Sequence, residues 1–299
     1  MTQFVCSEID AAVLTASYCI LHRYYQVEHR MKNSARYKGE HIISYAEYGD
    51  NDGYPIVINH GLIASITDSH LFERLIQIGA HLICIARPGY GASSPYEMRA
   101  IAEWGDIVSV LVGELNLSQF DVLGMSSGAP YSYAIGYKFP EKVRNIYIFS
   151  GIPALYDEEI LLDWPYEVNR NATIADLQKL AHELFFSSLT PEDLGKAGIR
   201  DSMMHDCFGI AQDFKLRCVD WGFRLSDVKQ NVYMRHSRLD EAVPFITAFL
   251  TSKLLPKCQL EVKETGEHFS MNALDDFIRV VIAANIGSHP VLPPFEKHE

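Results

Sequence analysis

Six short apolar runs, each closed by a turn and most followed by a helical pattern, constrain the fold of this 299-residue sequence more than any other feature. Such near-continuous runs are typical of strands buried on both faces of a sheet. They are PIVINHG at 55–61, HLICIARPG at 81–89, FDVLGMSSG at 120–128, VRNIYIFSG at 143–151, NVYMRHS at 231–237 and QLEVKETG at 259–266. Strands that alternate with helices predict an α/β fold with a mostly parallel, helix-flanked sheet.

Further patterns fill in this framework. The alternating segment HIISYAEYG at 41–49 predicts one more strand. Apolar residues at helical spacing predict helices over 68–79, 98–116, 129–138 and 272–285.

One segment breaks the alternation of strands and helices. About 80 residues without a clear strand separate Ser150 from Asn231, and they contain helical patterns such as TIADLQKLAHELFFSSL. We therefore predict a helical cap at 154–225, inserted into a core made of 39–153 and 226–299.

The N-terminal residues 1–38 form a predicted helical extension. An apolar stripe over 9–27 indicates an amphipathic helix that docks on the body, with a membrane-edge or dimer helix as the alternatives. Residues 28–38 are polar and are interpreted as a connector. The sequence leaves the oligomeric state open, a homodimer included.

Charge and cysteine content exclude several classes of protein. The 26 Lys and Arg residues against 38 Asp and Glu give a net charge of −12, without the basic footprint of nucleic-acid binding or of anionic membrane surfaces. The six cysteines are scattered and show no zinc spacing, so we expect free thiols, no metal and no cofactor. The first ten residues lack Lys and Arg, which argues against a secretory signal and favours a cytoplasmic protein.

The strongest chemical signal is GMSSG at 124–128, which fits the pattern G-x-S-x-G. It directly follows the buried run FDVL and precedes a helical stretch, which is the strand–turn–helix setting of a nucleophile elbow. Small residues at 124 and 128 relieve crowding in so sharp a turn. Ser126 is thus the candidate nucleophile at the carboxyl edge of the sheet, where ligands bind in open α/β folds.

A serine nucleophile needs a base, and the base needs an orienting carboxylate. His268 follows the last buried run and so lies at the same edge, unlike most of the other histidines. Asp240 follows the run NVYMRHS, 28 residues before His268, with Glu241 as the adjacent alternative. The chain order Ser, Asp, His is the order that the α/β-hydrolase arrangement requires.

Two backbone N–H groups are candidates for stabilising the charge that develops on a substrate oxygen. NHGL at 59–62 follows a buried strand, and the glycine lets the backbone turn so that the Leu62 N–H faces the pocket. The N–H of Ser127, one residue past the nucleophile, is the natural second donor. We expect the His60 side chain to brace loops and not to transfer protons.

These segments together resemble the α/β-hydrolase fold superfamily, in its cap-bearing branch. The resemblance covers about 39–285 and rests on EYGDNDGYPIVINHG, RPGYGASS, LNLSQFDVLGMSSG, SRLDEAVP and GEHFS. It implies the α/β-hydrolase fold with an inserted cap. The sequence departs from the family pattern at Ala86, where the family often has Asp, at Ser127, and at Ala129–Pro130 after the elbow.

The identity of the candidate nucleophile and the composition of the predicted cap reduce the number of reactions and substrates to consider. Members of this fold that are haloalkane dehalogenases or epoxide hydrolases use Asp at the elbow, so Ser126 favours acyl transfer. The cap carries 13 Asp or Glu against seven Lys or Arg, which disfavours strongly anionic substrates, and its aromatic residues suit an apolar pocket. We predict a serine hydrolase for a small, largely apolar carboxylic ester. The alternatives are a C–C bond hydrolase with the same triad and a non-catalytic ligand-binding protein or receptor.

Overall fold

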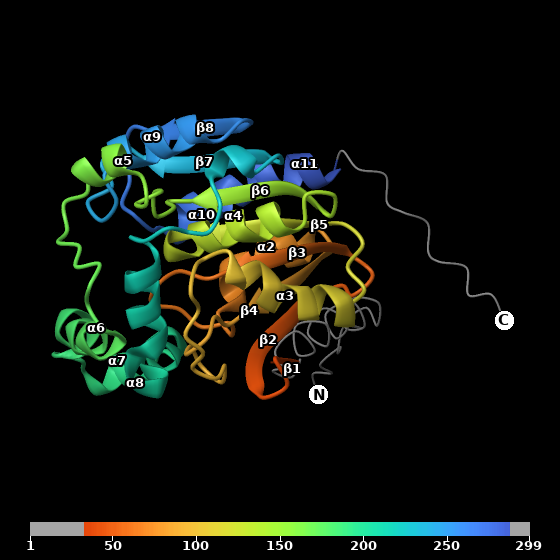
Figure 1. The fold of residues 1–299 in the computed structure, drawn as a ribbon. Helices are drawn as coiled ribbons and strands as arrows, with labels where there is room; N and C mark the ends of the chain where they lie inside the picture. Colours follow the sequence, from red (N-terminus) through yellow and green to blue (C-terminus); the bar gives the residue numbers. More distant parts are fainter. Residues whose placement is uncertain (1–32, 288–299) are drawn as a thin grey trace, which may run out of the picture.

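The computed structural model describes residues 33–287, and in this range eight strands form one sheet (Figure 1). The order across the sheet is β1-β2-β4-β3-β5-β6-β7-β8. Only the pairs β1–β2 and β2–β4 are antiparallel, which confirms the predicted mostly parallel α/β fold. The strands are β1 (Asn33–Tyr37), β2 (His41–Gly49), β3 (Tyr54–Asn59), β4 (Ala80–Ile85), β5 (Phe120–Met125), β6 (Val143–Phe149), β7 (Asn231–Ser237) and β8 (Cys258–Lys263).

Helices and short helical turns connect the strands. They are η1 (Ser69–Phe72), α2 (Glu73–Gln77), α3 (Glu103–Glu114), η2 (Ser126–Gly128), α4 (Ala129–Lys138), α5 (Glu158–Leu162), α6 (Ile174–Ala181), η3 (His182–Phe186), α7 (Pro191–Gly195), α8 (Ala197–Leu216), η4 (Leu225–Asp227), α9 (Phe245–Leu254), α10 (Met271–Phe277), η5 (Ile278–Ile282) and α11 (Ala283–Gly287).

The central strands are buried on both faces because each face supports its own hydrophobic core. Successive side chains of a strand point to opposite faces, and Val122 and Leu123 of β5 accordingly belong to different cores. Trp104 of α3 and Tyr131 of α4 pack with Val122, whereas Phe277 of α10 packs with Leu123. This double burial explains why the strand sequences are almost continuously apolar.

The core begins earlier than predicted, at β1, and the predicted boundary at residue 39 is wrong. Residues 33–37, predicted as part of a polar connector within the extension 1–38, form β1, which pairs with β2 from Asn33↔Tyr45 to Tyr37↔His41. Only Ala35 and Tyr37 of this edge strand are buried, so its sequence is too polar to be recognised as a strand. The amphipathic helix predicted at 9–27 lies outside the described residues.

The helix α3 begins at Glu103, five residues after the predicted start at residue 98. The preceding segment makes long-range contacts instead of helical ones. The Met98 N–H donates to Gln212 Oε1 at 2.7 Å, and the Ala102 N–H donates to the Trp221 carbonyl at 2.8 Å. Tertiary contacts thus override the helical pattern of these residues.

The chain between β6 and β7 forms helices and loops and contributes no strand to the sheet. Figure 1 shows α6, α7 and α8 grouped to one side of the sheet. The end of this segment joins the main core, since Trp221 is fully buried and stacks on Tyr133 of α4 with ring centroids 6.5 Å apart. The segment therefore shares its apolar interior with the sheet.

Candidate active site

Ser126 lies in the sharp turn between β5 and α4, with a φ of 48°. This left-handed conformation is uncommon and strained for a residue other than glycine. A Cβ atom on Gly124 would lie 2.3 Å from Ser132 Oγ, and one on Gly128 would lie 2.2 Å from the Asn59 carbonyl oxygen. The close packing of the turn therefore requires both glycines of GMSSG, and it holds Ser126 in its strained position.

The structure brings Ser126, His268 and Asp240 together. His268 Nε2 lies 2.8 Å from Ser126 Oγ, and His268 Nδ1 lies 2.8 Å from Asp240 Oδ2. With a proton on Nδ1, the ring donates to the carboxylate and presents the Nε2 lone pair to the serine hydroxyl. The three residues follow β5, β7 and β8, so the parallel sheet places them at one edge.

Asp240 sits in an environment that keeps it ionised. Its Oδ1 atom accepts hydrogen bonds from the N–H groups of Ala242 at 2.9 Å and Val243 at 2.8 Å. Burial raises the pKa of Asp240, but the hydrogen bond and charge of His268 and the Val243 N–H outweigh it, and the net shift is downward. The alternative carboxylate, Glu241, is exposed, whereas Asp240 contacts the imidazole.

A second histidine, His236, also contacts the Asp240 carboxylate. No sequence motif pointed to this residue. Its Nε2 atom lies 2.9 Å from the Val243 carbonyl oxygen and 3.3 Å from Asp240 Oδ2. The residue is buried at the end of β7, and burial lowers its pKa. The neutral ring therefore donates from Nε2 toward both oxygens and helps to fix Asp240.

Both predicted oxyanion residues line the same cavity as Ser126. The loop after β3 passes over the serine, since a Cβ atom on Gly61 would lie 3.8 Å from Ser126 Cβ. Within residues 33–287, no hydrogen-bond acceptor takes the Leu62 N–H. Ser127 follows Ser126 in η2 at the start of the helical turn.

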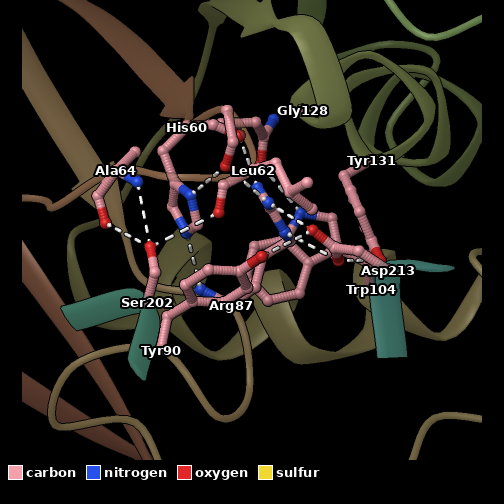
Figure 2. Close-up of polar contacts among 12 residues, drawn as sticks. His60, Leu62, Ala64, Arg87, Tyr90, Trp104, Gly128, Tyr131, Ser202 and Asp213 are labelled. Atoms are coloured by element: carbon pink, nitrogen blue, oxygen red, sulfur yellow. Dashed lines mark hydrogen bonds and ion pairs between the residues drawn. The ribbon is translucent and has the colours of Figure 1, made fainter. Parts of the chain in front are cut away.

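The His60 side chain braces this loop, as its position after β3 predicts. Its Nδ1 atom contacts the Gly61 carbonyl oxygen at 2.7 Å, and its Nε2 atom accepts the Arg87 N–H at 3.3 Å. Burial, and then the charge of Arg87, lower the pKa of His60 well below its usual value. Figure 2 shows that His60 belongs to a network around Arg87 and Asp213. Arg87 opens the motif RPGYGASS but was given no role from sequence, and Asp213 lies in none of the motifs.

A cavity of about 1320 Å³ lies over Ser126 and His268. Its walls come from the loops at the sheet edge and from the helical segment between β6 and β7. The side chains from the helical segment are mostly apolar: Trp164, Tyr166, Val168, Leu177, Leu180, Leu184, Phe185, Ile199 and Phe214. Other aromatic residues of that segment pack into the core that contains Val122 and Trp104, including Tyr156, Trp221 and Phe223.

Charged residues of both signs line the cavity, so its wall is less acidic than the composition of the segment suggests. The acidic residues are Asp68, Glu167 and Asp176, and the basic ones are Arg170, Lys196, Lys215 and Arg217. Arg217 lies over the aromatic rings of Trp164 and Phe214, with its Cζ atom 5.5 and 4.4 Å from their centroids.

No cluster of three or more His, Cys, Asp or Glu side chains suited to a metal ion occurs in the described part of the chain. The cysteines in this range, Cys84, Cys207, Cys218 and Cys258, carry free thiols. None of the helices described is both long enough and apolar enough to cross a membrane.

Sequence comparison matches residues 54–271 to the model of a family described as alpha/beta hydrolase fold. Among characterised and uncharacterised relatives, 2-hydroxy-6-oxo-2,4-heptadienoate hydrolase of Pseudomonas putida is 22% identical over 77% of this chain and 88% of its own length. The uncharacterized hydrolase YcgS of Bacillus subtilis is 24% identical over 47% of this chain, and the match spans about half (52%) of that protein.

Solved structures share the architecture. The esterase EaEST from Exiguobacterium antarcticum superimposes with a TM-score of 0.67 at 20% identity, over 86% of this chain and 100% of the esterase. The meta-cleavage product hydrolase CumD, as its A129V mutant, gives a TM-score of 0.60 at 18% identity, over 85% and 97% of the two chains. At these identities the similarity shows the fold.

Proposed function

The chain belongs to the alpha/beta hydrolase fold family, and from this premise we propose that it is a serine hydrolase acting on a largely apolar carboxylic ester or related acyl compound. The observation that carries the proposal is the double contact of His268, which lies 2.8 Å from both Ser126 Oγ and Asp240 Oδ2. A serine hydroxyl reacts as a nucleophile only when a base is in hydrogen-bond reach and is itself oriented.

In the acylation step, Ser126 Oγ attacks the ester carbonyl carbon and its proton passes to His268 Nε2. The buried carboxylate of Asp240 stabilises the imidazolium that forms. The Leu62 and Ser127 N–H groups donate to the developing oxyanion, in a site preorganised before the substrate binds. The tetrahedral intermediate then collapses, the bond to the alcohol oxygen breaks, and His268 returns the proton to the departing alcohol.

In the deacylation step, a water molecule takes the place of the alcohol. His268 Nε2 removes a proton from this water as its oxygen attacks the acyl carbon, and the same N–H groups stabilise the second oxyanion. The bond to Ser126 Oγ then breaks and the serine regains its proton from His268, which releases the carboxylic acid and restores the starting state.

The cavity supports a substrate of more than a few carbon atoms. Its volume of about 1320 Å³ exceeds the range of about 300–1000 Å³ that is usual for small-molecule sites. Because its walls are largely apolar, they favour an extended acyl or alcohol group over a short polar one.

The helical segment at 154–225 acts as a lid in this proposal. Residues of α6 and η3, among them Leu180 and Leu184, line the cavity that contains Ser126. A lid that excludes water strengthens hydrogen bonds to the oxyanion and shapes the choice of acyl group.

A second candidate is the hydrolysis of a C–C bond with the same three residues. It is favoured by the relative from Pseudomonas putida, a 2-hydroxy-6-oxo-2,4-heptadienoate hydrolase, of which the match covers 88%. Arg170, Lys196, Lys215 and Arg217 in the cavity wall are compatible with a carboxylate-bearing substrate of that kind.

The test compares p-nitrophenyl esters from acetate to dodecanoate with 2-hydroxy-6-oxo-2,4-heptadienoate, using wild type and Ser126→Ala. We expect ester turnover that is highest for medium or long acyl groups and absent in the variant. Faster turnover of the dienoate selects the C–C hydrolase instead. Tight binding of these compounds with no turnover of either class identifies a ligand-binding protein and rejects both enzymatic proposals.

A further inference from the structure

The Arg87 side chain donates two hydrogen bonds to the loop that leads into Leu62, the proposed oxyanion donor. Its Nη1 group donates to the His60 carbonyl at 2.6 Å, and its Nη2 group donates to the Gly61 carbonyl at 2.9 Å (Figure 2). The side chain is only 1% exposed, so these hydrogen bonds are shielded from water. A planar guanidinium with its donors in a fixed fork holds two neighbouring carbonyls in one geometry.

The Gly61 carbonyl and the Leu62 N–H belong to the same peptide group. In a trans peptide these two groups point in opposite directions, and the described residues contain no cis peptide bond. Arg87 and His60 Nδ1 both contact the Gly61 oxygen on the buried side. The Leu62 N–H is thereby directed away from them, and donors on the carbonyl polarise the amide and strengthen its N–H as a donor.

Asp213 of α8 holds Arg87 in place and balances its charge. The guanidinium contacts the carboxylate through Nη2 at 2.7 Å and Nε at 3.2 Å. The hydroxyls of Tyr90 and Tyr131 also donate to this carboxylate, at 2.9 and 2.6 Å. Asp213 is 4% exposed, so the pair is a fully satisfied buried cluster.

The part of α8 that precedes the break in its backbone at Met204–Cys207 reaches the loop at a second point. Ser202 Oγ of α8 accepts the Ala64 N–H at 3.1 Å and lies 3.4 Å from the Leu62 carbonyl oxygen. The oxyanion loop is therefore fixed from the helical segment on both sides of Leu62: directly by Ser202, and through Arg87 by Asp213.

We propose that Arg87 is a positioning residue for the oxyanion hole, which acts through the Gly61–Leu62 peptide and is anchored to the lid by Asp213. This inference rests on the proposed function, because it assigns Arg87 a role toward the transition state of that reaction. Apolar residues of similar volume are often at least as stabilising as a buried ion pair. A role in positioning the loop therefore gives a reason for a charged cluster at this place.

The test replaces the ion pair without leaving a buried charge, in the double variant Arg87→Met/Asp213→Leu, alongside Arg87→Lys and Asp213→Asn. Replacing both partners together avoids the cost of one unpaired buried charge. Arg87→Lys and Asp213→Asn keep the test decisive if the lost hydrogen bonds to the loop carbonyls and from Tyr90 and Tyr131 destabilise the double variant. The readouts are kcat and KM for p-nitrophenyl acetate and the inhibition constant of phenylboronic acid, whose tetrahedral adduct with Ser126 places an oxygen in the oxyanion hole.

The matched control is Asp121→Asn. Asp121 is an equally buried aspartate that accepts hydrogen bonds from two tyrosines, Tyr54 and Tyr147, but it lies at the other end of β5 from Ser126. Its replacement perturbs a similar cluster and should leave kcat and boronate inhibition within about twofold of wild type, because its side-chain hydrogen bonds within residues 33–287 go to Tyr54, Asn145 and Tyr147 and not to the oxyanion loop.

We expect the double variant to lower kcat by about 10²-fold, the lower end of the loss seen when an oxyanion donor is removed. KM should change little, and phenylboronic acid should weaken in parallel with kcat. Unchanged kcat and boronate inhibition in folded Arg87 and Asp213 variants overturn the positioning role and leave the serine hydrolase intact. A wild type that neither turns over the ester nor binds the boronate overturns both.

Discussion

At the scale of single residues, the candidate nucleophile Ser126 is held against its own backbone preference. The residue adopts a φ of 48°, which glycine tolerates better than serine. We expect Ser126→Gly to be more stable than Ser126→Ala by about 1 kcal/mol, because both lose the same hydrogen bond to His268 but only glycine relieves the strain. Urea unfolding of the two inactive variants measures the difference. Equal stabilities would show that the turn is unstrained.

Asp240 and Glu241 are adjacent in sequence but differ in their contacts. Asp240 receives the His268 Nδ1–H, whereas Glu241 is exposed. We expect Asp240→Asn to lower kcat by about 10⁴-fold, because an amide in this place favours the wrong imidazole tautomer. Glu241→Gln is the control and should retain turnover. The reverse result would mean that the proposed triad has the wrong carboxylate.

At the scale of elements, α6 and η3 supply apolar side chains to the cavity wall, and we expect these side chains to influence which acyl groups fit. Leu180 of α6 lines the cavity and is 39% exposed, so a larger side chain can extend into the open space. We expect Leu180→Trp to reduce kcat/KM for p-nitrophenyl octanoate about 10-fold relative to the acetate, because pocket contacts of methylene groups are worth about 1–3 kcal/mol.

Leu162→Trp on α5 is the matched control, since Leu162 is exposed and is not part of the cavity wall. Its preference between octanoate and acetate should equal that of wild type. An unchanged preference in Leu180→Trp as well would mean that the sheet loops alone select the acyl group, and it would contradict the lid.

Elements could be predicted from sequence where their surroundings in the fold require a recognisable pattern in consecutive residues. The central strands are apolar on both faces, and the elbow needs glycines at 124 and 128, so both features are visible in the residues themselves. The edge strand β1 is half exposed and carries no such pattern. The partner of Arg87 was also not visible, because Asp213 lies 126 residues away and only the packing of α8 brings it near.

At the scale of the whole molecule, two buried histidines couple stability to pH. Burial lowers the pKa of His60 and of His236, so in the folded protein both stay neutral where an unfolded chain takes up protons. Stability is then fully present above the unfolded histidine pKa of about 6.5 and falls as the pH drops below it.

We therefore expect the urea midpoint to decrease from pH 7.5 to pH 5, a window above the titration of ordinary carboxylates. The variant His236→Gln should show a weaker dependence, because it removes one of the two groups. An equal slope in wild type and variant would mean that His236 does not contribute through its protonation.

Trapping the acyl-enzyme reveals directly whether Ser126 carries the acyl group. The protein is mixed with p-nitrophenyl acetate, quenched in acid within the first turnovers and digested, and the peptides are analysed by mass spectrometry. We predict an acetyl group on Ser126 in wild type and none at this position in His268→Ala, where the base is missing. Steady turnover with the acetyl group on another residue, or with Ser126 unmodified throughout, would mean that Ser126 is not the nucleophile.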